Sequence, residues 1–430
     1  MDLRFSEAGL MADVRLPAIA LTIAAFSTLA VTALQSGSSS SSAEGTDQVS
    51  PGETVTDAET ASTFLVVAGG GAPSYNEIAL EKNVWYFQRT LTHLGAVVAD
   101  ATVFFANGND QQATIRYLDP LGQEQFKAPD VEFLTGAATR TNVQGWLDAY
   151  PQTDAGIEDC PVLMYFTGHG ALNPQNNDDN ALILWEEALL SVQDLAQTLD
   201  HWPTDIPFVT MMAQCYSGSF ANLIYEGGDP EQPVALQSRC GFFATVKTRP
   251  SVGCTPLVNE ADYRDYSSSF FAGLSGRDRL GHPVASADYD TDGQVSFAEA
   301  HAFAKVDGET SDWPISTAEA WLHQQALETD KVNILAAPMV EWLAVAPPER
   351  RFVIQALSAK LGYNLTTAFA DSPTPRARWS SPPQEVLTAY HQRLRMELIN
   401  VGMEQAIRSS GDQTTITTLE KLLACESGSW

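Results

Sequence analysis

The sequence predicts an α/β fold in which an open, mainly parallel sheet is flanked by helices. Between residues 64 and 246, short apolar runs alternate with amphipathic segments. This alternation is typical of parallel strands joined by helices that cover both faces of a sheet. The chain has 430 residues, of which 44% are hydrophobic and 9% aromatic, so it is long enough and apolar enough to bury such a core.

The expected strands are the apolar runs of this alternation. They cover residues 64–68, 101–106, the run VLMYFTGHG at 162–170, the run IPFVTMMAQ that precedes Cys215, and 241–246. Helical spacing of apolar residues predicts helices at 78–94, 141–152 and 192–199. The glycines at 69–71 match no phosphate-binding pattern and are interpreted as a tight turn. The polar stretch 107–140 predicts no element.

Helices are also expected in the C-terminal region, residues 311–430. Leu, Ile and Trp recur there at helical spacing in segments such as AEAWLHQQALE, ERRFVIQALSAKL and QEVLTAYHQRLRMELINVGMEQAI. We interpret these positions as packing faces and assign no chemistry to them. A loop rich in Ser and Pro at 372–383 precedes the last helix.

The N-terminal residues indicate export. An apolar run at 16–34 is followed by a polar, Ser-rich and acidic stretch at 36–62. We interpret residues 1–35 as a secretory signal, with an uncleaved membrane anchor as the alternative, and residues 36–62 as a flexible tether. The folded part then divides into 63–310 and the helical region 311–430. We therefore expect a periplasmic or extracellular protein that contacts a membrane only through this anchor.

Charge excludes one class of partner. The chain carries 24 basic and 53 acidic residues, a net charge of −29, and no basic cluster. Binding to nucleic acid requires clustered Lys and Arg, so a nucleic-acid partner is not expected. The acidic surface is interpreted as a solvated one.

Five cysteines follow the tether, so in an exported protein some are expected to pair. Cys240 and Cys254 bracket a short loop and are the preferred disulfide. Cys215 is expected to be a free thiol.

A histidine and a cysteine end two of the predicted strands. His169 and Gly170 close the first run, and Cys215 closes the second. The carboxyl ends of parallel strands converge, so the thiol and the imidazole could act as a nucleophile and an acid/base. Small residues follow Cys215 at 217–219, ahead of an expected helix, and we expect them to admit a substrate carbonyl. The backbone N–H groups of Cys215 and Gly170 would stabilise its oxyanion. The alternative is that the Cys is a core residue and His-Gly a turn.

The motifs TGHG and AQCYSGS resemble those of the caspase-like cysteine peptidases, most closely the legumain branch. The resemblance covers about 63–310. It implies a dyad of His169 and Cys215, a protein or peptide substrate, and no cofactor for the chemistry. Two features depart from legumains: Ala213 stands where they carry an acidic residue, and no Arg-His pair occurs at 76–80.

The resemblance leaves the reaction and the preferred residue open. The branch includes a transamidase, so transfer to an amine is an alternative to hydrolysis. Lys247 and Arg249 favour an acidic residue before the cleaved bond, whereas Asp262 favours a basic one. A third alternative is an inactive fold that serves as a calcium-binding interaction protein.

That third alternative rests on a second motif, DYDTDGQVSFAE at 288–299. It matches the twelve-residue loop of EF-hands, with Gly293 at the sharp turn. The expected Ca²⁺ ligands are Asp288, Asp290, Asp292, Gln294 (through its carbonyl), Ser296 and Glu299. Because no paired loop is found, we expect a structural ion, and the alternative is an acidic turn without metal.

Overall fold

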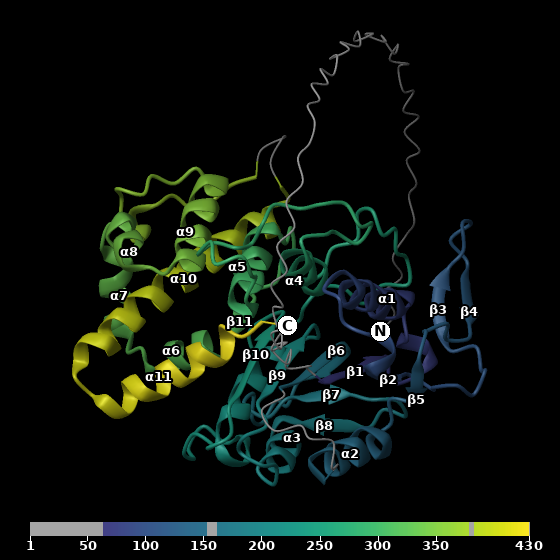
Figure 1. Ribbon diagram of the computed structural model, residues 1–430. Helices are drawn as coiled ribbons and strands as arrows, with labels where there is room; N and C mark the ends of the chain where they lie inside the picture. Colours follow the sequence, from purple (N-terminus) through teal and green to yellow (C-terminus); the bar gives the residue numbers. More distant parts are fainter. Residues whose placement is uncertain (1–62, 153–160, 378–381, 430) are drawn as a thin grey trace, which may run out of the picture. The chain divides into compact units, whose positions relative to one another are not determined.

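A computed structural model of the chain describes residues 63–152, 161–377 and 382–429. In this part, a mainly parallel central sheet is flanked by helices (Figure 1), which confirms the predicted α/β class. The expected signal or anchor, the tether and Cys160 lie outside the described residues. None of the described helices is long and apolar enough to span a membrane.

The main sheet has the strand order β11-β10-β9-β6-β1-β2-β5. These strands are β1 (Thr63–Gly69), β2 (Thr102–Phe105), β5 (Leu134–Gly136), β6 (Val162–Ala171), β9 (Phe208–Met212), β10 (Arg239–Phe243) and β11 (Ile315–Ser316). Neighbours pair in parallel, except that β11 is antiparallel to β10. Phe166 of β6 pairs with Met212 of β9, so His169, near the end of β6, and Cys215, just after β9, lie at the carboxyl ends of adjacent strands.

Short strands occupy places where the sequence predicts none. β3 (Ile115–Leu118) and β4 (Glu124–Lys127) form a separate antiparallel hairpin within the stretch 107–140. β7 (Ala181–Ile183) and β8 (Leu189–Ser191) continue the end of β6 as an antiparallel ribbon. Strands of three or four residues, several of them polar, carry too little periodicity to be recognised locally.

Helices cover both faces of the sheet. On one face lie α1 (Ile78–His93), α4 (Tyr266–Ser275) and α5 (Phe297–Asp307), and on the other lie α2 (Arg140–Ala149) and α3 (Val192–Leu199). Strand side chains alternate between two cores, as the pleat requires: Tyr165 belongs to the first, whereas Met164 and Phe166 belong to the second.

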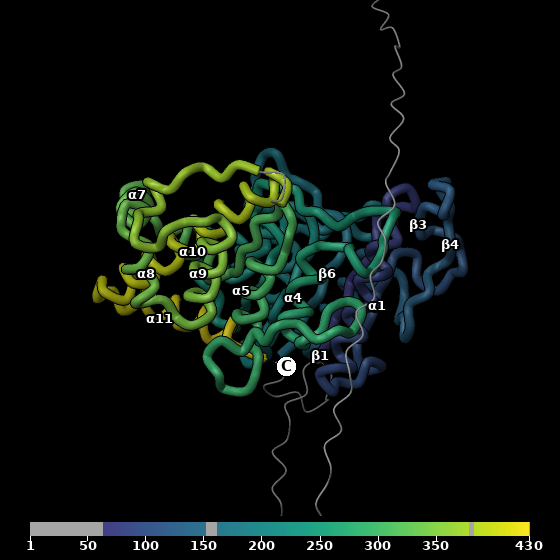
Figure 2. Tube along the Cα trace, turned by 90° about the horizontal axis from the view of Figure 1, so that it is seen from above, coloured from purple at the N-terminus to yellow at the C-terminus, as the bar shows by residue number. Residues whose placement is uncertain are grey.

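The C-terminal helices gather at the β10–β11 end of the sheet, opposite the β3–β4 hairpin (Figure 2). They are α6 (Thr317–Gln325), α7 (Glu328–Ala336), α8 (Met339–Val345), α9 (Pro348–Leu361), α10 (Gln384–Ser410) and α11 (Gln413–Glu426). They share an apolar core with Ala302 and Val306 of α5. This region also contributes β11, so it is continuous with the sheet.

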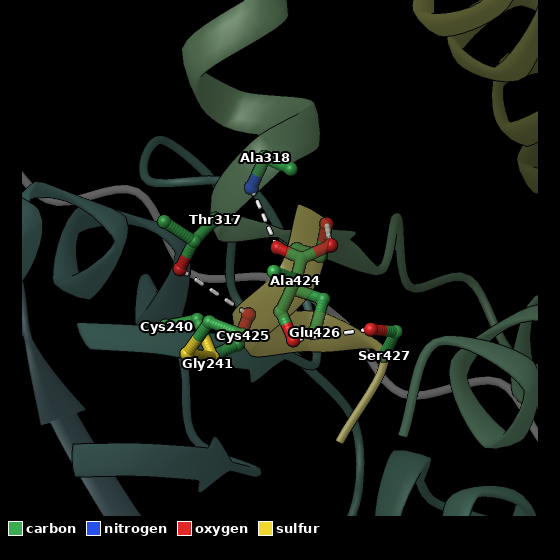
Figure 3. Close-up of a disulfide and its surroundings, with 9 residues drawn as sticks. Cys240, Gly241, Thr317, Ala318, Ala424, Cys425, Glu426 and Ser427 are labelled. Atoms are coloured by element: carbon green, nitrogen blue, oxygen red, sulfur yellow. Dashed lines mark hydrogen bonds between the residues drawn. A yellow bond between two sulfur atoms is a disulfide. The ribbon is translucent and has the colours of Figure 1, made fainter. Parts of the chain in front are cut away.

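A disulfide joins Cys240 of β10 to Cys425 of α11 (Figure 3). The expected pairing of Cys240 with Cys254 is therefore wrong. Cys240 lies within a buried strand, on a face that α11 approaches, whereas Cys254 lies in a loop beside β6. Closeness along the chain did not decide which thiols meet. Cys215 is free, as predicted.

Candidate active site

Cys215 follows β9 in a tight turn. The N–H of Ala213 donates to the carbonyl of Phe166 at 2.9 Å, which continues the contact with β6 beyond the end of β9. Tyr216 has φ 60°, in the left-handed region, and its N–H donates to the carbonyl of Arg249 at 2.8 Å. The half-buried Cys215 thiol lies next to the segment that contains Arg249, and its Sγ accepts the N–H of Ser251 at 3.3 Å.

The small residues after Cys215 have a packing role. Ser217 and Ser219 are fully buried, in a 3-10 helix that stands where an ordinary helix was expected. A Cβ at Gly218 would lie 2.8 Å from both the nitrogen of Lys247 and the carbonyl oxygen of Thr245. The structure therefore corrects the expectation that these residues admit a substrate: they let the turn pack against residues 245–247.

His169 is held by residues that the sequence did not single out. Its Nε2 lies 2.9 Å from Oε2 of Glu77, whose other oxygen accepts a bond from Arg116 at 2.9 Å. Burial raises the pKa of Glu77, but its contacts with His169 and Arg116 outweigh burial, and the pKa lies below its ordinary value. The ring of Tyr75 meets the imidazole edge to face, with centroids 5.2 Å apart.

Gly170 brings the two strand ends into direct contact. A Cβ at this position would lie 2.1 Å from the carbonyl oxygen of Cys215, so only glycine fits. The structure thus brings the backbones of Gly170 and Cys215 together, and His169 precedes Gly170 on β6. Within the described residues, no hydrogen bond joins His169 to Cys215.

A second free thiol lies beside this site. Cys254 Sγ is 3.6 Å from the carbonyl oxygen of Gly168 on β6. Part of Cys254 is exposed to solvent, but its sulfur is surrounded by protein atoms. This burial raises the pKa of the Cys254 thiol, and the nearby Glu77 and Cys215 raise it further. The same loop is anchored by the N–H of Val252, which donates to the buried carboxyl of Asp312 at 3.0 Å. Burial raises the pKa of Asp312 to about 7.

The residues considered for substrate preference have other partners. Lys247 pairs with Asp178, and Arg249 stacks over Trp313 at 4.1 Å from the ring centroid. Ala213 is buried and Asp262 is exposed. A cavity of about 650 Å³ between α2 and α3 is lined by Arg140, Leu147 and Trp202, among others, and by neither His169 nor Cys215.

The predicted calcium loop folds around three carboxylates. Oxygens of Asp288, Asp290 and Asp292 lie within 4.8 Å of one another, and Gly293 has φ 93°, as the sharp turn requires. One oxygen of Asp288 is buried and has no hydrogen-bond partner among the described residues. Hard oxygens in this arrangement suit a divalent cation such as Ca²⁺.

Glu299 and Ser296, two of the other expected ligands, are engaged in protein contacts. Glu299 Oε1 accepts the N–H groups of Tyr289 and Asp290, and its Oε2 accepts that of Ser296. The hydroxyl of Ser296 in turn caps the first turn of α5. Gln294 is expected to bind through its backbone carbonyl, and its side chain accepts a bond from the hydroxyl of Ser429 at 3.1 Å. The three aspartates are thus brought together, whereas Glu299 and Ser296 are held by protein contacts.

Comparison with known proteins adds little. No family model and no curated protein matches the chain. Among solved structures, it is similar to protein GSU0716 from Geobacter sulfurreducens, with 13% identity over 56% of this chain and 88% of that one and a TM-score of 0.34. A likeness of this size carries no conclusion about function.

Proposed function

We propose that this chain is a cysteine peptidase of the caspase-like type, similar to the legumain branch, with Cys215 as nucleophile and His169 as acid/base. The observation that supports it is the contact between the two strand ends, where Gly170 packs against the carbonyl of Cys215. A free thiol and an imidazole thereby share one edge of the sheet, where loops that follow parallel strands bind ligands.

In the proposed reaction, the Cys215 thiolate attacks the carbonyl carbon of a peptide bond. The N–H groups of Cys215 and Gly170 are proposed to stabilise the resulting oxyanion. His169 gives a proton to the leaving amine as the C–N bond breaks, and a thioester remains on Cys215. A water molecule, deprotonated by His169, then cleaves the thioester and regenerates the thiol. No cofactor takes part in these steps.

A Cys-directed peptidyl probe tests this proposal. We expect the full chain to be labelled at Cys215 and to cleave peptides from a library, and Cys215→Ala to do neither. Cys254→Ser is the matched control, because among the described residues it removes the other free thiol, and it should keep both activities. Equal labelling of Cys215→Ala and the native chain would overturn the peptidase proposal and favour an inactive fold. Products that carry an added amine would instead show transamidation.

We also propose that the loop 288–299 binds Ca²⁺ through Asp288, Asp290 and Asp292. The clustered carboxylates and the unpartnered Asp288 oxygen support this proposal. Glu299 would join only after it exchanges its backbone partners for the ion. Titration calorimetry with CaCl₂ tests it: we expect binding of one ion per chain, and the absence of heat and of any stabilisation would overturn it.

A further inference from the structure

We propose that Glu77 is a positioning residue that fixes the tautomer and the ring orientation of His169. This inference rests on the proposed Cys215–His169 chemistry. The juxtaposition is direct, since the Glu77 carboxylate lies 2.9 Å from His169 Nε2. The two residues lie 92 positions apart in the sequence, so the fold itself brings them together.

The carboxylate is held firmly enough to orient a ring. Glu77 directly precedes α1, and its side chain is only 5% exposed. Arg116 on β3 donates to its second oxygen, and the N–H of Arg116 also donates to the carbonyl of Asn76. Because both oxygens have partners and the backbone is tied to β3, the carboxylate cannot rotate without loss of a partly buried ion pair.

The bond to Glu77 has a chemical consequence for the imidazole. In a neutral histidine, the nitrogen that donates to a carboxylate carries the proton, and the other nitrogen keeps the basic lone pair. Glu77 therefore selects the tautomer protonated at Nε2 and leaves Nδ1 as the base. Among the described residues, Nδ1 of His169 has no hydrogen-bond partner.

Tyr75 confines the ring from a second direction. Its ring lies at 88° to the imidazole, and its hydroxyl donates to Oε1 of Glu187 at 2.9 Å. Glu186 and Glu187 have φ 68° and 58°, a left-handed conformation that is costly for residues other than glycine. A turn in this conformation places Glu187 against Tyr75, so both contacts of the imidazole are themselves anchored.

Glu81 offers a matched control. It is also a buried carboxylate, one helical turn away in α1, and it also pairs with the β3–β4 hairpin, through Lys127. Its other oxygen accepts the N–H of Asp130 rather than an imidazole. Glu81→Gln should therefore disturb folding about as much as Glu77→Gln without touching His169.

Two measurements on the full chain test the inference. Long-range ¹⁵N–¹H spectra of histidine-labelled protein, assigned with His169→Ala, should show the Nε2-protonated tautomer in native protein and in Glu81→Gln. Glu77→Gln should give a mixture. In peptide cleavage, Glu77→Gln should lower kcat by about 10- to 100-fold at nearly unchanged KM, because acid/base efficiency falls while binding persists. Glu77→Ala should lower it further.

The outcomes separate the inference from the peptidase proposal. A native tautomer and native kcat in Glu77→Gln, or an equal loss of kcat in Glu81→Gln, would overturn the positioning role. If the native chain shows no Cys215-dependent cleavage, the peptidase proposal fails, yet the spectra still report whether Glu77 sets the tautomer.

Discussion

Gly170 lies directly against the backbone of Cys215. The carboxyl end of β6 and the turn after β9 therefore leave no room for a side chain between them. A Cβ on Gly170 would come within 2.1 Å of the Cys215 carbonyl oxygen and 2.9 Å of Cγ of Gln214. The glycine that the sequence marks beside the histidine therefore also sets the position of the cysteine.

Replacement of this glycine is expected to damage the site and the fold together. In Gly170→Ala the two strand ends must separate, which should lower the free energy of unfolding by about 1–3 kcal/mol and abolish probe labelling of Cys215. Urea unfolding and labelling measure both effects. Gly145→Ala in α2 is the control: no atom lies within 4 Å of the added Cβ, so stability should rise by about 0.5–1 kcal/mol. If Gly170→Ala kept the native unfolding free energy and native labelling of Cys215, the close contact between Gly170 and the Cys215 backbone would be contradicted.

The disulfide between Cys240 and Cys425 should stabilise the fold because it closes a loop with a sequence separation of 185. We expect the double variant Cys240→Ser/Cys425→Ser to lose about 2–5 kcal/mol of unfolding free energy, chiefly because the unfolded chain gains freedom. Cys254→Ser should leave stability nearly unchanged. Alkylation of unreduced, unfolded protein should modify Cys215 and Cys254 and spare the pair. Modification of Cys240 would refute the pairing.

Beside the disulfide, Glu426 should make stability fall as pH rises. Its buried carboxyl accepts the N–H of Ala318 (Figure 3) and the hydroxyl of Ser316. Burial raises the pKa of this carboxyl to about 8. At pH values between the ordinary pKa of a carboxyl and about 8, the folded chain therefore keeps a proton that the unfolded chain has released. The free energy of unfolding declines as the pH rises through this range.

Glu426→Gln removes that titration and keeps a donor and an acceptor. Relative to native protein, its unfolding free energy should rise by roughly 1 kcal/mol per pH unit between pH 5 and 8. Denaturant unfolding at several pH values measures this difference. Glu309→Gln, at an exposed position, should show no such trend. A pH-independent difference for Glu426→Gln would argue against a protonated carboxyl.

Calcium should stabilise the native chain, and removal of one ligand should abolish the effect. At a concentration 100 times the dissociation constant, Ca²⁺ would add about 2.7 kcal/mol to the free energy of unfolding. Asp290→Asn should lose this gain, whereas Asp262→Asn, an exposed carboxylate outside the loop, should keep it. Thermal unfolding with CaCl₂ and with EDTA provides the comparison. If Ca²⁺ raised the unfolding temperature equally in both variants, the ion would not bind at the loop 288–299.

Much of the fold could be predicted because its signals are local. The apolar runs that end near His169 and Cys215 became β6 and β9, and the helix expected at 192–199 begins and ends as predicted. The three aspartates of the loop cluster because their spacing is built into one turn. The strands β3, β4 and β5 were missed because three or four residues carry too little periodicity to be recognised in the sequence.

What the sequence determined by itself is the α/β class and the placement of Gly170 and Cys215 at the carboxyl ends of adjacent strands, with His169 beside the glycine. Periodicity within each segment and the geometry of parallel strands suffice for that. Only the tertiary structure decided that Glu77 holds the imidazole and that Cys240 pairs with Cys425 rather than Cys254. Those contacts join residues 92 and 185 positions apart, and no local pattern encodes which distant side chains packing will bring together.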